Sequence, residues 1–223
     1  MKIRPDLLNN EDLMALVQSA QNLTSQISLE VLLNKILLKA SDLTHSQDSS
    51  IILHNKVKNS LYFAAATGET ASFLLERWGE NSEKNIPIET SKAGQVFTSL
   101  KSIVIDKVED HYKEVDKDTQ KNTESVICVP LNIQGQCIGV MQLLNKRTGN
   151  YSEKDLTLIE YFANISAVAI RNAQYFKELM VHMGFSSGQD DNKISPIEII
   201  EELEKPARSE VLSIMFVDMR GFT

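Results

Sequence analysis

Two apolar segments, 125–132 and 136–144, constrain the fold of this chain most, because only a few polar residues separate them. Aliphatic and β-branched residues dominate both segments, which favours β-strands. Gln134 and Gly135 lie between them and suit a tight turn. The sequence therefore predicts an antiparallel β-hairpin in the second half of the chain.

Helical and extended segments alternate around this hairpin. Apolar residues repeat at three and four positions over 10–44, which predicts two helices, with Asn10 and Ser28 as their expected caps. Further segments are expected as follows: a hairpin of 50–54 and 60–66, an extended piece at 86–88, a helix over 93–100, a strand over 102–105, and a short helix with loops within 106–124. This order predicts an α+β fold with an antiparallel sheet.

A long helix is expected from Glu153 to about Met183. One apolar seam along it has alternating spacings of three and four: Ile159, Phe162, Ser166, Ala169, Ala173, Phe176, Met180 and Met183. We expect residues 156–170 to pack on their own domain. From Asn172 onward, we expect a parallel contact with the same helix of a second subunit, which predicts a homodimer.

Composition excludes several classes of protein. The 223 residues include 23 Lys and Arg against 30 Asp and Glu, and the resulting net charge of −7 argues against nucleic-acid binding. No unbroken apolar segment of the sequence is long enough to span a membrane. The first residues do not resemble a signal peptide. We therefore expect a cytoplasmic protein in which Cys128 and Cys137 are reduced.

The end of the chain has a different character. Residues 184–196 have the composition of a linker, and residues 210–217 are expected to form a strand that has no partner after it. We therefore expect one sensory domain over 1–180, a linker over 181–208, and the truncated start of a second domain over 209–223.

Three motifs resemble GAF domains. They are the segment 92–98 (KAGQVFT), the segment from Val115 to Leu131, and the strand 139–146 (GVMQLLNK), which ends in Asn-Lys. The resemblance covers about residues 10–180 and implies a central antiparallel sheet flanked by helices, with a long C-terminal signalling helix. It departs from GAF domains of phosphodiesterases at Leu156, where Glu is common, and at Glu124-Ser125, which replaces Arg-Asn.

The resemblance also implies ligand-binding residues between the sheet and the segment 91–123: Ala93, Gly94, Thr119, Thr123 and Gln142. A helix that begins near Ala93 and Gly94 suits a phosphate group, and Gln142 would face a base. Three alternatives remain open, namely a cyclic nucleotide (cAMP or cGMP), another small ligand, and no ligand. In the last case Ala93-Gly94 is only a tight helix start, and the threonines face solvent.

A second group implied by the resemblance is structural: Asn145, Lys146, Tyr151 and Asp155. In the resembling phosphodiesterases, a Lys–Asp bridge closes a loop away from the ligand. We therefore expect an ion pair between Lys146 and Asp155, worth about 0–1 kcal/mol if it is exposed.

Residues 213–223 (SIMFVDMRGFT) resemble the first strand and turn of class III adenylate or guanylate cyclases. There, the residues that match Asp218 and Met219 help to hold Mg²⁺ or Mn²⁺, which bind between carboxylates and a triphosphate. One carboxylate cannot build that site, so the fragment itself is expected to be inactive.

Two functions remain open at this point. The first is a regulatory GAF domain that senses a small molecule and controls cyclic nucleotide synthesis by a cyclase. The second is a dimerisation module without a ligand. An enzyme in its own right is disfavoured, because the sequence shows no complete set of nucleophile, base or metal ligands. The GFSSG segment at 184–188 does not indicate a hydrolase, because it lacks the context of a nucleophile elbow.

Overall fold

The computed structural model describes residues 4–24, 28–107 and 123–182. Their elements, in chain order, are η1 (Pro5–Leu7), α1 (Asn10–Thr24), α2 (Leu29–Thr44), β1 (Ser46–Asn55), β2 (Ser60–Ala66), α3 (Ala71–Trp78), α4 (Lys92–Ser99), β3 (Ile103–Ile105), β4 (Val126–Ile133), β5 (Gln136–Lys146) and α6 (Glu153–His182).

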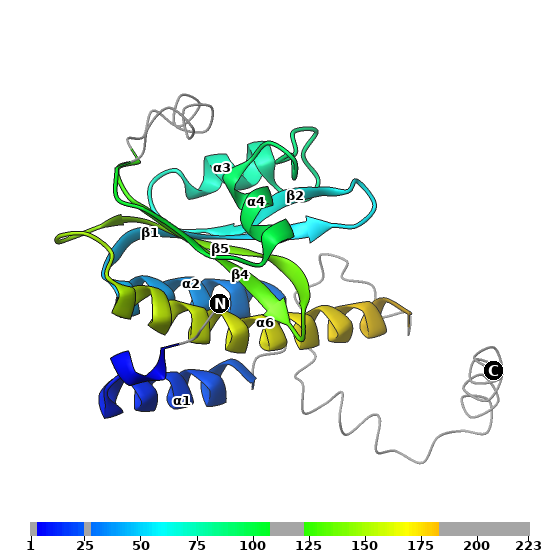
Figure 1. Ribbon diagram of the computed structural model, residues 1–223. Helices are drawn as coiled ribbons and strands as arrows, with labels where there is room; N and C mark the ends of the chain where they lie inside the picture. The colour runs from blue at the N-terminus through cyan, green and yellow to red at the C-terminus, as the bar shows by residue number, and fades with distance from the viewer. Residues whose placement is uncertain (1–3, 25–27, 108–122, 183–223) are drawn as a thin grey trace, which may run out of the picture. The chain divides into compact units, whose positions relative to one another are not determined.

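The strands form one five-stranded sheet in the order β2-β1-β5-β4-β3, and every neighbouring pair is antiparallel. Helices α2 and α6 lie on one face of the sheet, with α1 beyond them, and α3 and α4 lie on the other face (Figure 1). Because β1, β2, β4 and β5 are covered on both sides, most of their positions are buried, whereas the short edge strand β3 has no buried position. The predicted α+β fold with a central antiparallel sheet is confirmed.

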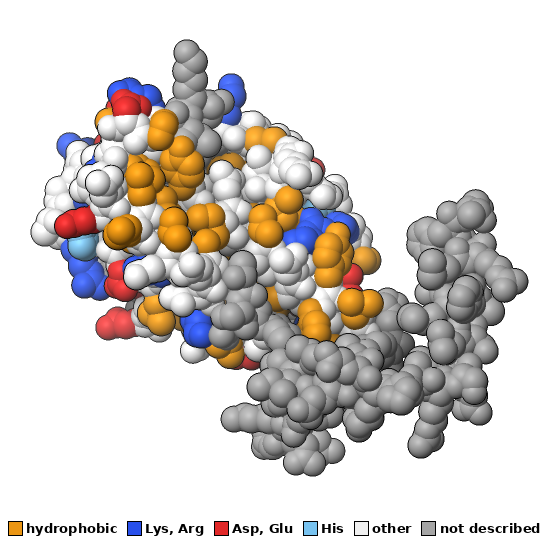
Figure 2. All heavy atoms as spheres, turned by 90° about the horizontal axis from the view of Figure 1, so that it is seen from below, with side chains coloured by type: hydrophobic (Ala, Val, Ile, Leu, Met, Phe, Trp, Pro, Cys, Tyr) orange, Lys and Arg blue, Asp and Glu red, His pale blue; other side chains and the backbone are white. Residues whose placement is uncertain are grey.

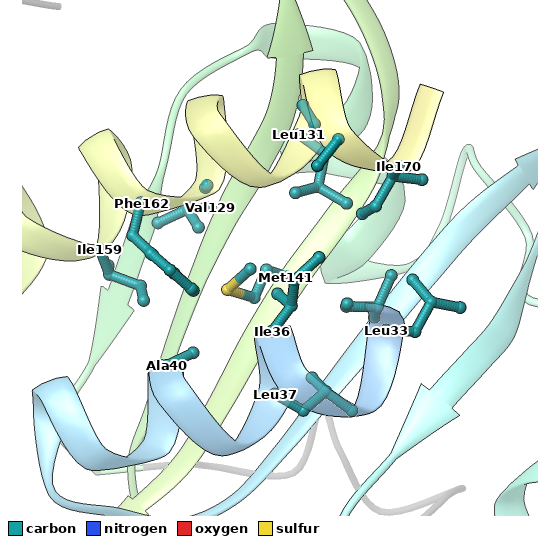
Figure 3. Close-up of a cluster of buried hydrophobic side chains, with 14 of the residues drawn as sticks. Leu33, Ile36, Leu37, Ala40, Val129, Leu131, Met141, Ile159, Phe162 and Ile170 are labelled. Atoms are coloured by element: carbon teal, nitrogen blue, oxygen red, sulfur yellow. The ribbon is translucent and has the colours of Figure 1, made fainter. Parts of the chain in front are cut away.

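The larger hydrophobic core lies between the sheet and helices α2 and α6 (Figure 3). Ile36 and Leu37 of α2 and Phe162 of α6 are fully buried there against Met141 of β5. Burying side chains of this size stabilises a domain by roughly 1.5–3 kcal/mol each. This core therefore holds α6 firmly along the sheet.

A smaller core lies on the opposite face, under α3 and α4. Val96 of α4 and Ile52 of β1 are buried in it, together with Trp78, the one tryptophan of the sequence. The helices on this face have only eight residues each, and their buried side chains pack into the same core as side chains of β1, β2, β4 and β5. This face carries the candidate site.

The predicted hairpin is confirmed as β4 and β5. Gln134 and Gly135 both have positive φ, at 50° and 91°, which is the conformation of the tight turn that matches strand twist. The hairpin of β1 and β2 and the strand β3 are also confirmed. Helix α3 was not predicted, because 67–85 carries no strong apolar repeat.

Two helix starts differ in detail from the prediction. Helix α1 is capped by Asn9 rather than Asn10: the Asp12 N–H donates to Asn9 Oδ1 at 2.8 Å, and the Asn9 N–H donates to Asp12 Oδ2 at 2.9 Å. Ser28 stands at the start of α2, but its side chain makes no capping hydrogen bond. Both helices nevertheless begin within a residue of the expected position.

The chain divides into two compact units, 1–179 and 180–223. The expected linker over 181–208 and the expected second-domain start over 209–223 lie outside the described residues, apart from the end of α6. Among the described helices, none is both long and apolar enough to cross a membrane.

Candidate functional site

Three uncharged polar side chains form a row across the middle of the sheet. Ser50 of β1 lies directly opposite Gln142 of β5, and Gln142 lies directly opposite Cys128 of β4. Side chains directly opposite each other on neighbouring strands share one face of the sheet. The Cys128 side chain belongs to the core beneath α3 and α4, so this polar row faces those helices.

The polar row is buried and uncharged. Gln142 is 6% exposed, and the Ser50 hydroxyl donates to its Oε1 at 3.4 Å. Burial raises the pKa of the Cys128 thiol to about 12, although a hydrogen bond with Gln142 opposes this shift. The thiol therefore stays protonated at neutral pH and is no nucleophile. The row offers hydrogen bonding, not covalent chemistry.

Helix α4 begins at the edge of this face. Ser91 has an extended backbone, and its Oγ accepts the N–H of Gly94 at 2.9 Å. The first intrahelical bond runs from the Gln95 N–H to the Ser91 carbonyl. The N–H groups of Lys92 and Ala93 precede that bond, so the helix itself supplies no acceptor for them. They are the groups that an anion at this terminus would meet.

Gly94 has a structural reason to be glycine. A Cβ at this position would overlap the backbone carbonyl of Ile88, in the extended segment that pairs with β2. Helix α4 therefore lies against the backbone of Ile88 at Gly94. The Gly94 N–H already donates a hydrogen bond to Ser91 Oγ. These contacts account for the glycine without any ligand.

Thr123 is 5% exposed and lies just before β4. The alternative in which this threonine faces solvent is therefore wrong. Thr119 lies outside the described residues, so the expectation that the two threonines share a helical face stays a prediction.

Asn145 fixes the backbone next to Thr123. It has a left-handed backbone, with φ of 55°, and its Oδ1 accepts the N–H groups of Glu124 at 2.8 Å and Ser125 at 3.4 Å. The Asn145 N–H in turn donates to the Ser125 carbonyl at 2.8 Å. The end of β5 thus holds the chain that leads into β4.

Lys146 extends this attachment to α6. Its Nζ lies 2.6 Å from Asp155 Oδ2 and also donates to the Thr44 carbonyl at 3.2 Å. Both charged side chains are largely buried, at 11% and 15% exposed, which the sequence did not indicate. The same carboxylate oxygen accepts the N–H and the hydroxyl of Ser152. The ion pair therefore joins β5, α2 and the first turn of α6.

Tyr151 packs against this ion pair. Its hydroxyl lies 2.9 Å from Ser46 Oγ, and the Lys146 ammonium lies 5.4 Å from the centre of its ring. All four residues of the predicted structural group therefore lie near the C-terminal end of β5, where the chain passes from the sheet to α6.

Sequence reasoning missed two members of the polar row, Ser50 and Cys128. Ser50 lies outside the three motifs, and Cys128 lies within the segment from Val115 to Leu131 without a binding role being expected for it. Only the strand register places the two side chains beside Gln142.

Within the described residues, no three His, Cys, Asp or Glu side chains are grouped to hold a metal. Asp218 and Met219, the predicted metal-binding pair, lie outside the described residues.

The fold and this site define a small-molecule-sensing domain. The family model described as "GAF domain" matches residues 28–170, and the chain belongs to that family. The match spans α2 to the middle of α6, including the polar row and the Lys146–Asp155 ion pair.

Relatives with known names are distant. The chain is 26% identical to a cGMP-specific 3',5'-cyclic phosphodiesterase of Drosophila ananassae over 238 residues, which covers 96% of this chain and 20% of that protein. The corresponding protein of Drosophila melanogaster is 25% identical, with 96% and 21% covered. The chain therefore spans about a fifth of the length of these relatives.

Solved structures agree on the fold. The GAF domain of a phosphoenolpyruvate-protein phosphotransferase from Coxiella burnetii matches with a TM-score of 0.64 and 16% identity, covering 75% of this chain and 96% of that one. The GAF domain of the corresponding Acinetobacter protein matches with a TM-score of 0.58, 16% identity, and 75% and 97% covered.

Proposed function

We propose that this GAF domain binds a cyclic nucleotide between the sheet and α4, and that α6 carries the effect of binding onward. The observation that carries the proposal is the buried polar row centred on Gln142, on the face of the sheet that α3 and α4 cover. The relatives named as cGMP-specific phosphodiesterases favour a cyclic nucleotide over other small ligands.

Each part of the ligand would have a matching group. A cyclic phosphate carries one negative charge, which suits the N–H groups of Lys92 and Ala93 at a helix N-terminus. The Gln142 amide has donors and an acceptor for a base edge. The hydroxyls of Thr119 and Thr123 would complete the site, as the resemblance implies.

Isothermal titration of the chain with cGMP and with cAMP tests this proposal. Replacing Gln142 with leucine keeps the size of the side chain but leaves polar ligand atoms unpaired, so we expect affinity to fall about tenfold or more. Gln95→Leu is the matched control, because Gln95 is exposed on α4. This variant should bind the nucleotide with the affinity of the unchanged protein. Absence of heat at millimolar nucleotide with folded protein would refute the proposal.

A dimerisation module without a ligand is the second candidate. It is favoured by the Gly94 contacts, because the Ser91 cap and the Ile88 carbonyl explain this glycine fully. Thermal denaturation separates the two candidates, since a ligand that binds only the folded state raises the melting temperature. If millimolar cAMP and millimolar cGMP both leave the melting temperature unchanged, the second candidate is supported.

We also propose that the domain regulates a catalytic domain of cyclic nucleotide signalling. Residues 213–223 resemble the start of a class III cyclase, in which Asp218 and Met219 would hold Mg²⁺ or Mn²⁺. The named relatives are phosphodiesterases rather than cyclases, so the catalytic activity is tested separately from ligand binding. An extended protein, meaning any longer protein that contains this chain, is assayed with ATP and GTP for cyclase activity and with cAMP and cGMP for phosphodiesterase activity. The two substrate sets distinguish the two activities.

The proposed signalling unit is a homodimer joined by α6. Coupling between sensor and catalytic domain requires that the ligand bind two arrangements of the dimer with different affinity. Cyclic nucleotide should then change the activity of the extended protein, while a variant that cannot bind ligand should not respond.

A further inference from the structure

The two edges of the sheet differ in how their backbones are paired. At the outer side of β2, the Leu61 N–H donates to the Ile86 carbonyl at 3.0 Å, and the Ile86 N–H donates to the Leu61 carbonyl at 2.9 Å. At the other edge, β3 pairs with β4 on one side, and none of the described residues pairs with its outer side. An open edge of this kind presents backbone N–H and C=O groups to which another strand can bind.

Strand β3 also exposes an apolar side chain on the face of the sheet that α6 covers. Val104 of β3 lies directly opposite Ile127 of β4, which belongs to the larger core. Side chains directly opposite each other share one face of a sheet, so Val104 lies on the α6 side. Val104 is 36% exposed, whereas Ile127 is fully buried. Helix α6 therefore covers β4 more completely than it covers β3.

A buried carboxylate lies beside this edge. Glu160 of α6 is only 7% exposed, and its Oε1 has no hydrogen-bond partner among the described residues. The hydroxyl of Ser102, the residue before β3, is buried and also lacks a partner there. Burial raises the pKa of the Glu160 carboxyl above its ordinary value, although the nearby Ser102 hydroxyl and the positive charge of the amino terminus oppose this rise.

Glu160 also lacks a basic side chain. Within 4–24, 28–107 and 123–182, no Lys, Arg or His forms an ion pair with it. Buried carboxylates are normally paired with a cation, because an isolated buried charge is costly. Asp155, on the same helix, is an example of the usual arrangement, with the Lys146 ammonium 2.6 Å away. The environment of Glu160 therefore suits a positively charged group that comes from outside the described domain.

We propose that the outer edge of β3 binds an extended basic segment of a partner protein, which adds a strand to the sheet and places a Lys or Arg side chain beside Glu160. The backbone of the added strand would pair with β3, as in β-strand addition. Its alternate side chains would lie on the α6 side and cover Val104. This inference does not depend on the proposed nucleotide site, which lies on the opposite face of the sheet.

The charge of Glu160 favours a basic segment over a second copy of this chain. If two antiparallel copies of β3 paired, each would present Ser102, Val104 and Asp106 on the α6 side. None of these residues is basic, so the Glu160 carboxylates of both copies would stay unpaired. A segment that carries Lys or Arg between apolar residues matches both Glu160 and Val104.

Exposed apolar side chains alone would not distinguish this edge from the rest of the surface. On α1, Leu13, Met14 and Val17 are 43%, 71% and 59% exposed. Figure 2 views the molecule from the side on which α1 lies in Figure 1, and hydrophobic side chains are spread among other side chains over that side. Scattered apolar side chains are normal on a protein surface. The β3 edge differs because a buried carboxylate without a basic partner lies beside it.

Fluorescence anisotropy of the full chain with a dye-labelled peptide tests the proposal. The probe is a short capped peptide in which valines and one central lysine alternate with threonines, and the matched peptide has norleucine in place of lysine. We expect the lysine peptide to bind about 30-fold more tightly or better, as for a buried charge pair. Glu160→Gln should remove this difference. Glu178→Gln is the control, because Glu178 is exposed on the same helix, and it should leave the difference unchanged.

Hydrogen exchange locates the bound peptide. The amides of Ile103–Ile105 should exchange more slowly when the lysine peptide is present, because an added strand takes up the free edge of β3. Slow exchange of these amides without peptide would show that another part of the chain, or a second copy, already occupies the edge, and would overturn the proposal.

The stability of the free Glu160→Gln chain completes the test. In urea denaturation without peptide, this variant should be at least as stable as the wild type, because it removes an unpaired buried charge. A less stable variant would show that a group of the chain itself already pairs with Glu160. That result, no binding of the lysine peptide at millimolar concentration, equal affinity for the two peptides, or an affinity difference that survives Glu160→Gln would each overturn the proposal.

Discussion

Replacing Lys146 with methionine is expected to lower the free energy of unfolding by about 3–5 kcal/mol. The substitution leaves the Asp155 carboxylate largely buried without its ammonium partner, which lies 2.6 Å away in the native protein. It also removes the hydrogen bond to the Thr44 carbonyl. An unpaired buried charge costs far more than an exposed pair contributes, so this loss exceeds the 0–1 kcal/mol expected for a surface bridge.

Urea denaturation followed by circular dichroism measures this loss. Lys154→Met is the matched control, because Lys154 pairs with Asp12 at 2.7 Å but is 44% exposed, and its removal should cost only about 0.2–1 kcal/mol. The double variant Lys146→Met/Asp155→Leu should recover part of the lost stability, since no unpaired charge remains. Equal losses for Lys146→Met and Lys154→Met would contradict the structural role of the buried pair.

The same ion pair predicts a dependence of stability on pH. Burial alone would raise the pKa of Asp155, but hydrogen bonds from Lys146 and Ser152 hold it below the ordinary value of 3.8. A carboxyl whose pKa is lower in the folded state stabilises the protein above its ordinary pKa, and this stability is lost as the pH falls through the folded value. The difference in unfolding free energy between wild type and Lys146→Met should therefore become smaller from pH 6 to pH 3. A difference that stays constant over this range would contradict the assigned role of the Asp155 carboxylate.

The parts of the fold that could be predicted are those with strong local patterns. The hairpin of β4 and β5 follows from its apolar segments and from Gln134-Gly135, whose backbone geometry matches the expected turn. Helix α6 begins at Glu153 as expected, because Ser152 and Asp155 cap its first turn through local hydrogen bonds. Signals of this kind depend on residues close in sequence, so the chain alone reveals them.

The remaining features depend on contacts between distant residues. Gln142 could be named from its motif, but Ser50 and Cys128 join it only through strand register, which the sequence does not specify. The apolar seam of α6 was expected to contact a second subunit from Asn172 onward, but the packing of the helix within the domain buries Ala173 and leaves Tyr175 exposed. The burial of the Lys146–Asp155 pair likewise depends on where β5, α2 and α6 meet.

Replacing Gly94 with valine is expected to lower the free energy of unfolding by about 3 kcal/mol, at the upper end of the usual cost of overpacking. The new Cβ would overlap the carbonyl of Ile88, which is backbone and cannot rotate aside as a side chain can. Helix α4 must then move away from the segment that pairs with β2, and Ala93 and Val96 lose part of their burial in the smaller core.

Thermal and urea denaturation measure this loss, and Gly135→Asn is the control. Gly135 has a left-handed backbone, with φ of 91°, but a Cβ there meets nothing within 4 Å, so asparagine should cost no more than about 1 kcal/mol. Since α4 carries the Lys92 and Ala93 N–H groups, Gly94→Val should also weaken cyclic nucleotide binding in any fraction that stays folded. A Gly94→Val protein as stable as the wild type would show that α4 can shift without loss of unfolding free energy. Packing would then not explain why residue 94 is glycine, and ligand binding would be the remaining explanation.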